Sequence, residues 1–110
     1  MRGERQRERR LRRFVVAEDS MRPTLHPGQQ LLAVRARRLR NGQLCVFEHP
    51  HRPGFWLVKR VDAVDGDSMV VRSDNVDAPG AVDSRVLGLV PTAGAYRVLV
   101  RSPRRHTAHD

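Results

Sequence analysis

Apolar residues occur along the chain in short runs that are rich in valine, leucine and aromatic side chains, and polar or glycine-containing segments separate these runs. β-Branched and aromatic residues favour strands, and short runs bounded by turn residues are typical of β-proteins. We find no convincing helical period between the first and last of these runs. The strands that the pattern predicts are Phe14–Ala17, Gln30–Arg35, Leu44–Glu48, Phe55–Val64, Ser68–Arg72, Val86–Val90 and Tyr96–Val100.

Turn residues lie between the predicted strands. His26-Pro27-Gly28 has the proline-glycine order of a type II turn, and Asn41-Gly42 predicts a second turn. Asp65-Gly66-Asp67 predicts a hairpin between two of the strands, and Ser73–Ser84 is polar enough to form an irregular loop. The pattern therefore predicts an all-β fold, either a small, partly closed barrel or a coiled antiparallel sheet.

The chain has 110 residues, which is enough for one domain with a modest core. Residues 1–13 are strongly basic, and we expect them to form either a charged helix or a disordered extension. We expect the folded domain to span residues 14–101 and a polar tail to span residues 102–110.

The formal net charge is +9, which suits nucleic acid or an anionic membrane surface as a partner. Much of this charge lies near the ends, with seven arginines in Met1–Arg13 and four in Arg97–Arg105. No aromatic residues alternate with these arginines to form a stacking platform, so we do not expect nucleic-acid binding. A basic β-module that binds nucleic acid or an acidic protein stays open as an alternative.

No apolar run approaches the roughly 20 residues that span a membrane. The apolar run Phe14–Ala17 is also too short for the hydrophobic region of a signal peptide, so we expect a protein without a membrane span in the cytoplasm. Cys45 is the only cysteine, which predicts a small core residue and excludes an internal disulfide. The histidines, among them His49 and His51 near two prolines, form no ligand set, so we expect neither a metal nor another cofactor.

Lys59 is the only lysine, whereas arginine occurs 20 times. A guanidinium stays protonated at any working pH, while a buried amine can lose its proton and act as a base. Lys59 follows Phe55-Trp56-Leu57-Val58, and burial among such residues favours the neutral amine. Ser20 follows another apolar run and precedes Pro23, and we predict that it is a nucleophile with Lys59 as its base.

Four segments, in order, resemble the sequence boxes of the signal peptidase I family of serine proteases, which is related by fold to the self-cleaving LexA-type repressors. The resemblance runs from about Val15 to Val90. It implies the fold of the signal peptidase and LexA catalytic domains. The matching segments are Ser20–Leu25 (S-M-x-P-T-L), Gly42–Phe47 (G-D-x-V-x-F), Lys59–Val61 (K-R-V), and Asp74-Asn75 followed by Asp83-Ser84-Arg85 and Gly88.

The resemblance also implies roles for individual residues. The Oγ atom of Ser20 would attack a peptide carbonyl, and Lys59 would accept the proton and pass it to the leaving amine. The backbone N–H of Ser20 would stabilise the oxyanion, and Met21 would line the substrate pocket. The residues that it implies as structural support are Pro23, Asp74, Asn75, Asp83 and Arg85, the last two as an ion pair.

Some positions depart from the family pattern. Glu18 stands where many relatives have serine or glycine, and because a carboxylate would repel an oxyanion we expect its side chain to point away. Ala81 stands where some relatives have a serine that contacts the lysine, so another group must orient Lys59. Ser73 replaces a glycine, while Gln29 and Gln43 replace aspartates, and we interpret these three as altered turns.

Within the family the chain looks most like the soluble proteases that mature nickel-type superoxide dismutase. This resemblance implies an endopeptidase whose partner is a protein precursor with an N-terminal leader. Two alternatives stay open, the basic β-module and a fragment of a LexA-type self-cleaving regulator. The second would need a DNA-binding domain, for which residues 1–13 are too short.

Overall fold

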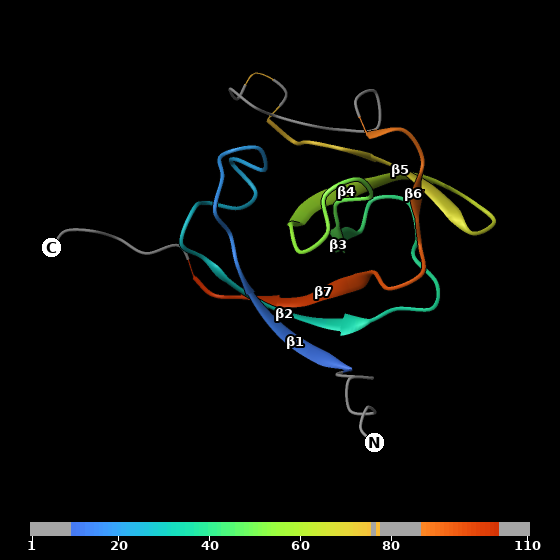
Figure 1. The fold of residues 1–110 in the computed structure, drawn as a ribbon. Coiled ribbons are helices and arrows are strands. Elements are labelled where there is room, and N and C mark those ends of the chain that lie inside the picture. Colours follow the sequence, from blue (N-terminus) through green and yellow to red (C-terminus); the bar gives the residue numbers. More distant parts are fainter. Residues whose placement is uncertain (1–9, 76, 78–86, 104–110) are drawn as a thin grey trace, which may run out of the picture.

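The structure, a computed structural model, describes residues 10–75, 77 and 87–103. These residues form one sheet of seven strands in the order β1-β2-β7-β3-β4-β5-β6, and neighbouring strands are antiparallel (Figure 1). The strands are β1 (Leu11–Val15), β2 (Gln30–Arg35), β3 (Leu44–Glu48), β4 (Trp56–Asp65), β5 (Ser68–Arg72), β6 (Val90–Pro91) and β7 (Tyr96–Arg101).

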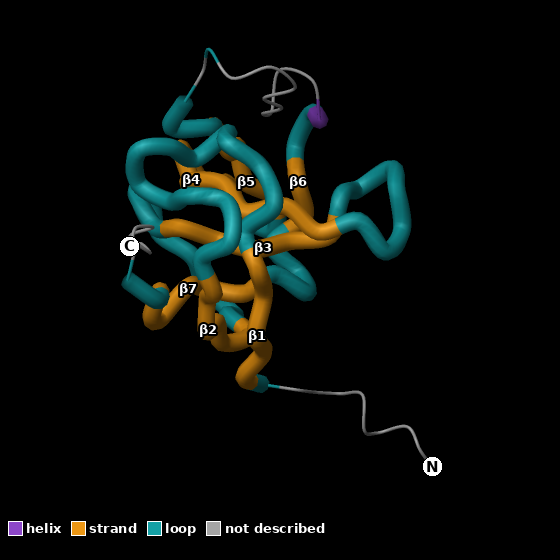
Figure 2. Tube along the Cα trace, turned by 90° about the vertical axis from the view of Figure 1, so that its left-hand side faces the viewer, coloured by secondary structure: helices purple, strands orange, loops and turns teal. Residues whose placement is uncertain are grey.

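The prediction of an all-β, antiparallel fold is confirmed. Strands β2, β3 and β5 have the predicted bounds, and the bounds of β4 and β7 differ by one residue. The sheet is not closed, because β1 and β6 lie at the two ends of the strand order. Of the two predicted forms, the fold is therefore a coiled open sheet, and Figure 2 shows β1, β2 and β7 on one side and β4, β5 and β6 on the other.

The first strand begins at Leu11, three residues before the predicted start, so the expectation of a helix or disorder was wrong for Leu11–Arg13. Leu11 pairs with Val34 of β2, and the guanidinium of Arg12 lies 4.7 Å from the ring centroid of Trp56. Strand pairing and stacking on an aromatic ring thus keep these basic residues in the sheet. The rest of the division into extension, domain and tail stays a prediction.

The strand predicted at Val86–Val90 is also different, because β6 contains only Val90 and Pro91. Gly88 has a φ angle of +80°, which is incompatible with a regular strand. Leu87 is buried and Leu89 is 62% exposed, so the segment before β6 packs as an irregular connection. Val86 lies outside the described residues.

Two clusters of buried side chains stabilise the sheet. One packs between β3, β4, β5 and the segment around β6, and its largest members include Phe47 and Met69. The other packs beneath the connection between β1 and β2 and includes Met21, Leu25 and Leu31. Within that connection, the φ angle of +91° at Gly28 agrees with the predicted turn after Pro27.

Within the described part of the chain, no helix is long and apolar enough to cross a membrane.

Candidate active site

Ser20 lies in a turn of the connection between β1 and β2, which we call the serine turn. The N–H of Leu25 donates to the carbonyl oxygen of Met21 at 2.8 Å, and the Arg22–Pro23 peptide bond within the turn is cis. The carbonyl oxygen of Ser20 accepts the N–H of Asn75 at 2.8 Å, and only 6% of Ser20 is exposed. The turn therefore fixes the serine against the segment that follows β5.

Lys59 lies on β4 and its side chain is almost completely buried, with 1% exposed. Its Nζ atom is 3.0 Å from the Oγ atom of Ser20 and 2.9 Å from the Oγ atom of Ser73. The fold thus brings together two residues that are 39 positions apart, as we predicted for a nucleophile and its base.

This geometry is suited to proton transfer. A distance of 3.0 Å between Nζ and Oγ lies within the range in which a base can accept the proton of a nucleophile. Lys59 is buried, so little water is available to solvate its amine.

Ser73 is the contact that sequence reasoning missed. We had interpreted it only as a turn residue that replaces a glycine, yet it is 2% exposed and contacts Lys59 directly. The predicted hairpin between β4 and β5 indicated only that the segment after β5 lies next to the middle of β4, and it did not single out Ser73.

Asp74 connects three segments of the site. Its Oδ1 atom accepts the Nε–H of Arg60 at 3.0 Å, and its Oδ2 atom accepts Nη2–H of Arg60 at 2.7 Å and the hydroxyl of Thr24 at 2.6 Å. The hydrogen bond from Arg60 lowers the pKa of Asp74, and the hydroxyl of Thr24 contributes in the same direction. Asp74 therefore joins the segment after β5 both to β4 and to the serine turn.

The other predicted support from this segment is Asn75. Its side chain donates to the carbonyl oxygen of Asp19 at 3.1 Å, and its backbone N–H donates to Ser20. Asn75 thus binds the backbone carbonyl oxygens of both Asp19 and Ser20.

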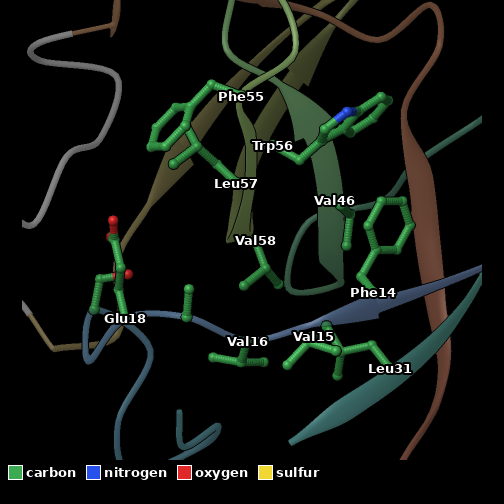
Figure 3. A pocket seen from close by; sticks show the side chains of 12 residues that line it. Phe14, Val15, Val16, Glu18, Leu31, Val46, Phe55, Trp56, Leu57 and Val58 are labelled. Carbon is green, nitrogen blue, oxygen red and sulfur yellow. The ribbon is translucent and has the colours of Figure 1, made fainter. Parts of the chain in front are cut away.

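A small apolar pocket with a volume of about 90 Å³ opens beside Ser20. Figure 3 shows the rings of Phe14 and Trp56 together at one end of the pocket and Glu18 at the other end. The rings of Phe14 and Trp56 are 5.5 Å apart, which gives the pocket a packed aromatic wall. A pocket of this size accommodates a small apolar side chain.

Glu18 lines the same pocket and is exposed (Figure 3), and the expectation that its carboxylate points away from the oxyanion stays a prediction. Met21 is fully buried in the core and is not among the residues that line this pocket, and its role in substrate binding stays a prediction. The sulfur of Met21 instead accepts the N–H of Asp74 at 3.4 Å. The predicted pair Asp83 and Arg85 lies outside the described residues, as does Ala81.

Among the described residues, no group of three or more histidine, cysteine or acidic side chains is arranged to hold a metal ion. Cys45 is fully buried on β3, where it pairs with Lys59 of β4, and its burial raises the pKa of the thiol to about 12.

The fold and the buried serine and lysine agree with a comparison to known families. Residues 7–82, more than half of the chain, match the family described as signal peptidase, peptidase S26, and the protein belongs to this family of peptidases. The matched range includes Ser20, Lys59 and Ser73 and ends before Asp83. No curated protein matches the chain.

Proposed function

We propose that the protein is a serine endopeptidase that uses Ser20 as its nucleophile and Lys59 as its general base. The observation that carries the proposal is the 3.0 Å contact between Lys59 Nζ and Ser20 Oγ, formed by the only lysine of the chain. The membership in a peptidase family supports the same class of reaction.

The proposed reaction has two steps. In the first, neutral Lys59 accepts the hydroxyl proton while Ser20 Oγ bonds to the substrate carbonyl carbon, and the resulting ammonium then protonates the leaving amine. In the second, Lys59 accepts a proton from water, the water oxygen attacks the acyl-enzyme, and the proton returns to Ser20 as the peptide acid leaves. The base thus ends each cycle in the neutral form.

Oxyanion stabilisation in this proposal comes first from the backbone N–H of Ser20. Among the described residues, no acceptor takes a hydrogen bond from this N–H. A donor that is fixed before charge develops stabilises the transition state without reorganising.

For the substrate, we propose a protein precursor with an N-terminal leader, and specifically the precursor of a nickel-type superoxide dismutase. The small apolar pocket beside Ser20 supports a requirement for a small apolar residue near the scissile bond.

The peptidase proposal is tested with a quenched-fluorescence peptide library. We expect the wild-type protein to cleave members of the library, and Ser20→Ala and Lys59→Arg each to lower kcat/KM by at least about 10³-fold. Lys59→Arg is the sharper change because it keeps a cation and removes the base. Ser68→Ala, in the hairpin away from the site, is the control and should keep full activity.

The dyad is wrong if either variant cleaves the library as fast as the wild type. The substrate is tested separately with the leader-bearing precursor of nickel-type superoxide dismutase, by measuring the mass of its new N-terminus. Cleavage of the library without cleavage of this precursor would reject the substrate and leave the dyad standing.

A further inference from the structure

We propose that Ser73 is a positioning residue for Lys59, so that the reaction centre consists of two serine hydroxyls on either side of one amine. The inference rests on the proposed dyad and adds to it the group that orients the base. Nζ of Lys59 lies 2.9 Å from Ser73 Oγ and 3.0 Å from Ser20 Oγ, and all three side chains are buried.

Strand register explains how Ser73 reaches the lysine. In the hairpin, Asp65 pairs with Ser68 and Ala63 with Val70, whereas Arg60 pairs with Arg72. The register shifts by one between Val61 and Ala63, where Asp62 forms a β-bulge. The next step of the shifted ladder brings Ser73 beside Lys59, and without the bulge Asp74 would take that place.

The bulge therefore decides which chemical group contacts the base. A carboxylate beside Lys59 would hold it as an ammonium, which cannot accept a proton. A hydroxyl contacts the amine without adding a charge. The observed register supplies the hydroxyl and moves the carboxylate of Asp74 to Arg60.

Contacts of its neighbours hold Ser73 in place relative to the nucleophile. Asp74 binds Arg60 and Thr24, and its N–H donates to the sulfur of Met21. Asn75 binds the backbone of Ser20. The segment that carries Ser73 is thus attached to β4 and to the serine turn, so the positions of both hydroxyls are set by the same contacts.

The chemical consequence concerns the lone pair of the amine. A neutral amine has two N–H bonds and one lone pair, so an N–H donated to Ser73 Oγ restricts rotation about the terminal bond of Lys59. The lone pair can then face the hydroxyl of Ser20, from which it accepts the proton. When Lys59 becomes an ammonium, Ser73 continues to accept an N–H and stabilises the charged form.

The test compares Ser73→Ala, Ser73→Gly and Ser73→Thr with the wild type on a library peptide that the wild type cleaves. We expect Ser73→Ala and Ser73→Gly to lower kcat by about 10- to 100-fold with KM changed less than about 2-fold, as for loss of a hydrogen bond to a charged group. Ser73→Thr keeps the hydroxyl and should retain more of kcat than either.

The pH dependence of kcat/KM is the second readout. Without Ser73 Oγ the ammonium loses an acceptor, so Lys59 becomes neutral at lower pH and the acid limb of the profile moves to lower pH. Each profile is normalised to its own maximum, so a smaller folded fraction in a variant does not move the limb. A purely structural role for Ser73 would leave the limb unchanged.

The inference is overturned if Ser73→Ala keeps kcat within about 2-fold of the wild type, or if its acid limb stays at the wild-type pH. The proposed dyad fails in a different way, through activity that survives Ser20→Ala or Lys59→Arg. If those two variants are inactive and Ser73→Ala is not, only the role of Ser73 is rejected.

Discussion

Arg60 and Asp74 form a two-point ion pair that links β4 to the segment after β5, with contacts of 3.0 and 2.7 Å. Only 11% of the Asp74 side chain and 23% of the Arg60 side chain are exposed, so water screens the pair weakly. Because Lys59 precedes Arg60 and Ser73 precedes Asp74, this ion pair holds the chain segments of Lys59 and Ser73 next to each other.

Replacing Asp74 with asparagine should lower the free energy of unfolding at neutral pH by about 2 kcal/mol, because hydrogen bonds to charged groups are lost. The fold lowers the pKa of Asp74, so its stabilisation is fully present above the ordinary carboxyl pKa of about 4. That stabilisation is lost as pH falls through the lower pKa of the folded state. Urea denaturation of wild type and variant between pH 2 and pH 7 measures the difference.

The expected result is a stability gap that is constant at neutral pH and narrows in acid. Asp65→Asn removes an exposed carboxylate of the β4–β5 hairpin and is the matched control, for which we expect little change. A gap between wild type and Asp74→Asn that widens in acid would contradict the assignment.

Replacing Arg60 with lysine should keep the charge and remove the planar fork that binds both oxygens of Asp74. We expect a loss of about 1 to 2 kcal/mol in the free energy of unfolding and a several-fold fall in kcat, because the segment with Ser73 is held less firmly. Arg72→Lys serves as the control, because it affects an exposed ion pair with Asp62 at 3.2 Å and only a longer contact of 3.8 Å with Asp74. Unchanged kcat with reduced stability would show that the pair does not support the site.

The fold and the contact between Ser20 and Lys59 could be predicted from the sequence because each depends on local patterns. The strands β2, β3 and β5 follow from runs of strand-forming residues between turns, and Lys59 was distinctive as the only lysine. Strand β1 was misplaced because its basic start, Leu11–Arg13, reads as a charged extension until its pairing with β2 is known. The basic residues of this segment suggested an extension, whereas its pairing with β2 forms only in the folded sheet.

The contact between Ser73 and Lys59 could not be predicted from local sequence patterns, for a different reason. If the strand pairing continued without a break from the Asp65-Gly66-Asp67 turn, Asp74 would lie opposite Lys59. Because Asp62 is unpaired, the register shifts by one residue and Ser73 lies there instead. A bulge changes every pairing beyond it while leaving the pattern of strand-forming residues intact. The sequence showed that Lys59 needed another group to orient it and could not show which residue supplies it.

Cys45 should be unreactive in the folded protein. It is fully buried, and burial raises the pKa of its thiol to about 12, whereas the thiolate is the reactive form. We expect a disulfide exchange reagent at pH 8 to modify the thiol only as fast as the protein unfolds, and immediately in 6 M guanidinium chloride. Rapid modification of the native protein would show that the strand pair carrying Cys45 and Lys59 opens readily.

The final prediction concerns Glu18, which lines the apolar pocket beside Ser20 (Figure 3). In the proposed reaction an oxyanion forms near Ser20, and a carboxylate on the same pocket opposes that charge. Glu18→Gln keeps the shape of the side chain and removes its charge, so we expect kcat to rise by roughly 2- to 10-fold at low ionic strength. The gain should shrink as salt is added, since salt screens exposed charges.

Asp19→Asn is the matched control for Glu18→Gln, because Asp19 lies one residue closer to Ser20 but forms an ion pair with Arg22 at 2.6 Å. Its negative charge is already compensated, so its removal should change kcat less than the removal of Glu18 does. Equal effects of the two variants would show that the net charge near the pocket, and not the position of Glu18, controls the rate. A fall in kcat for Glu18→Gln would show that the carboxylate assists the reaction, in which case its contact with the substrate is favourable.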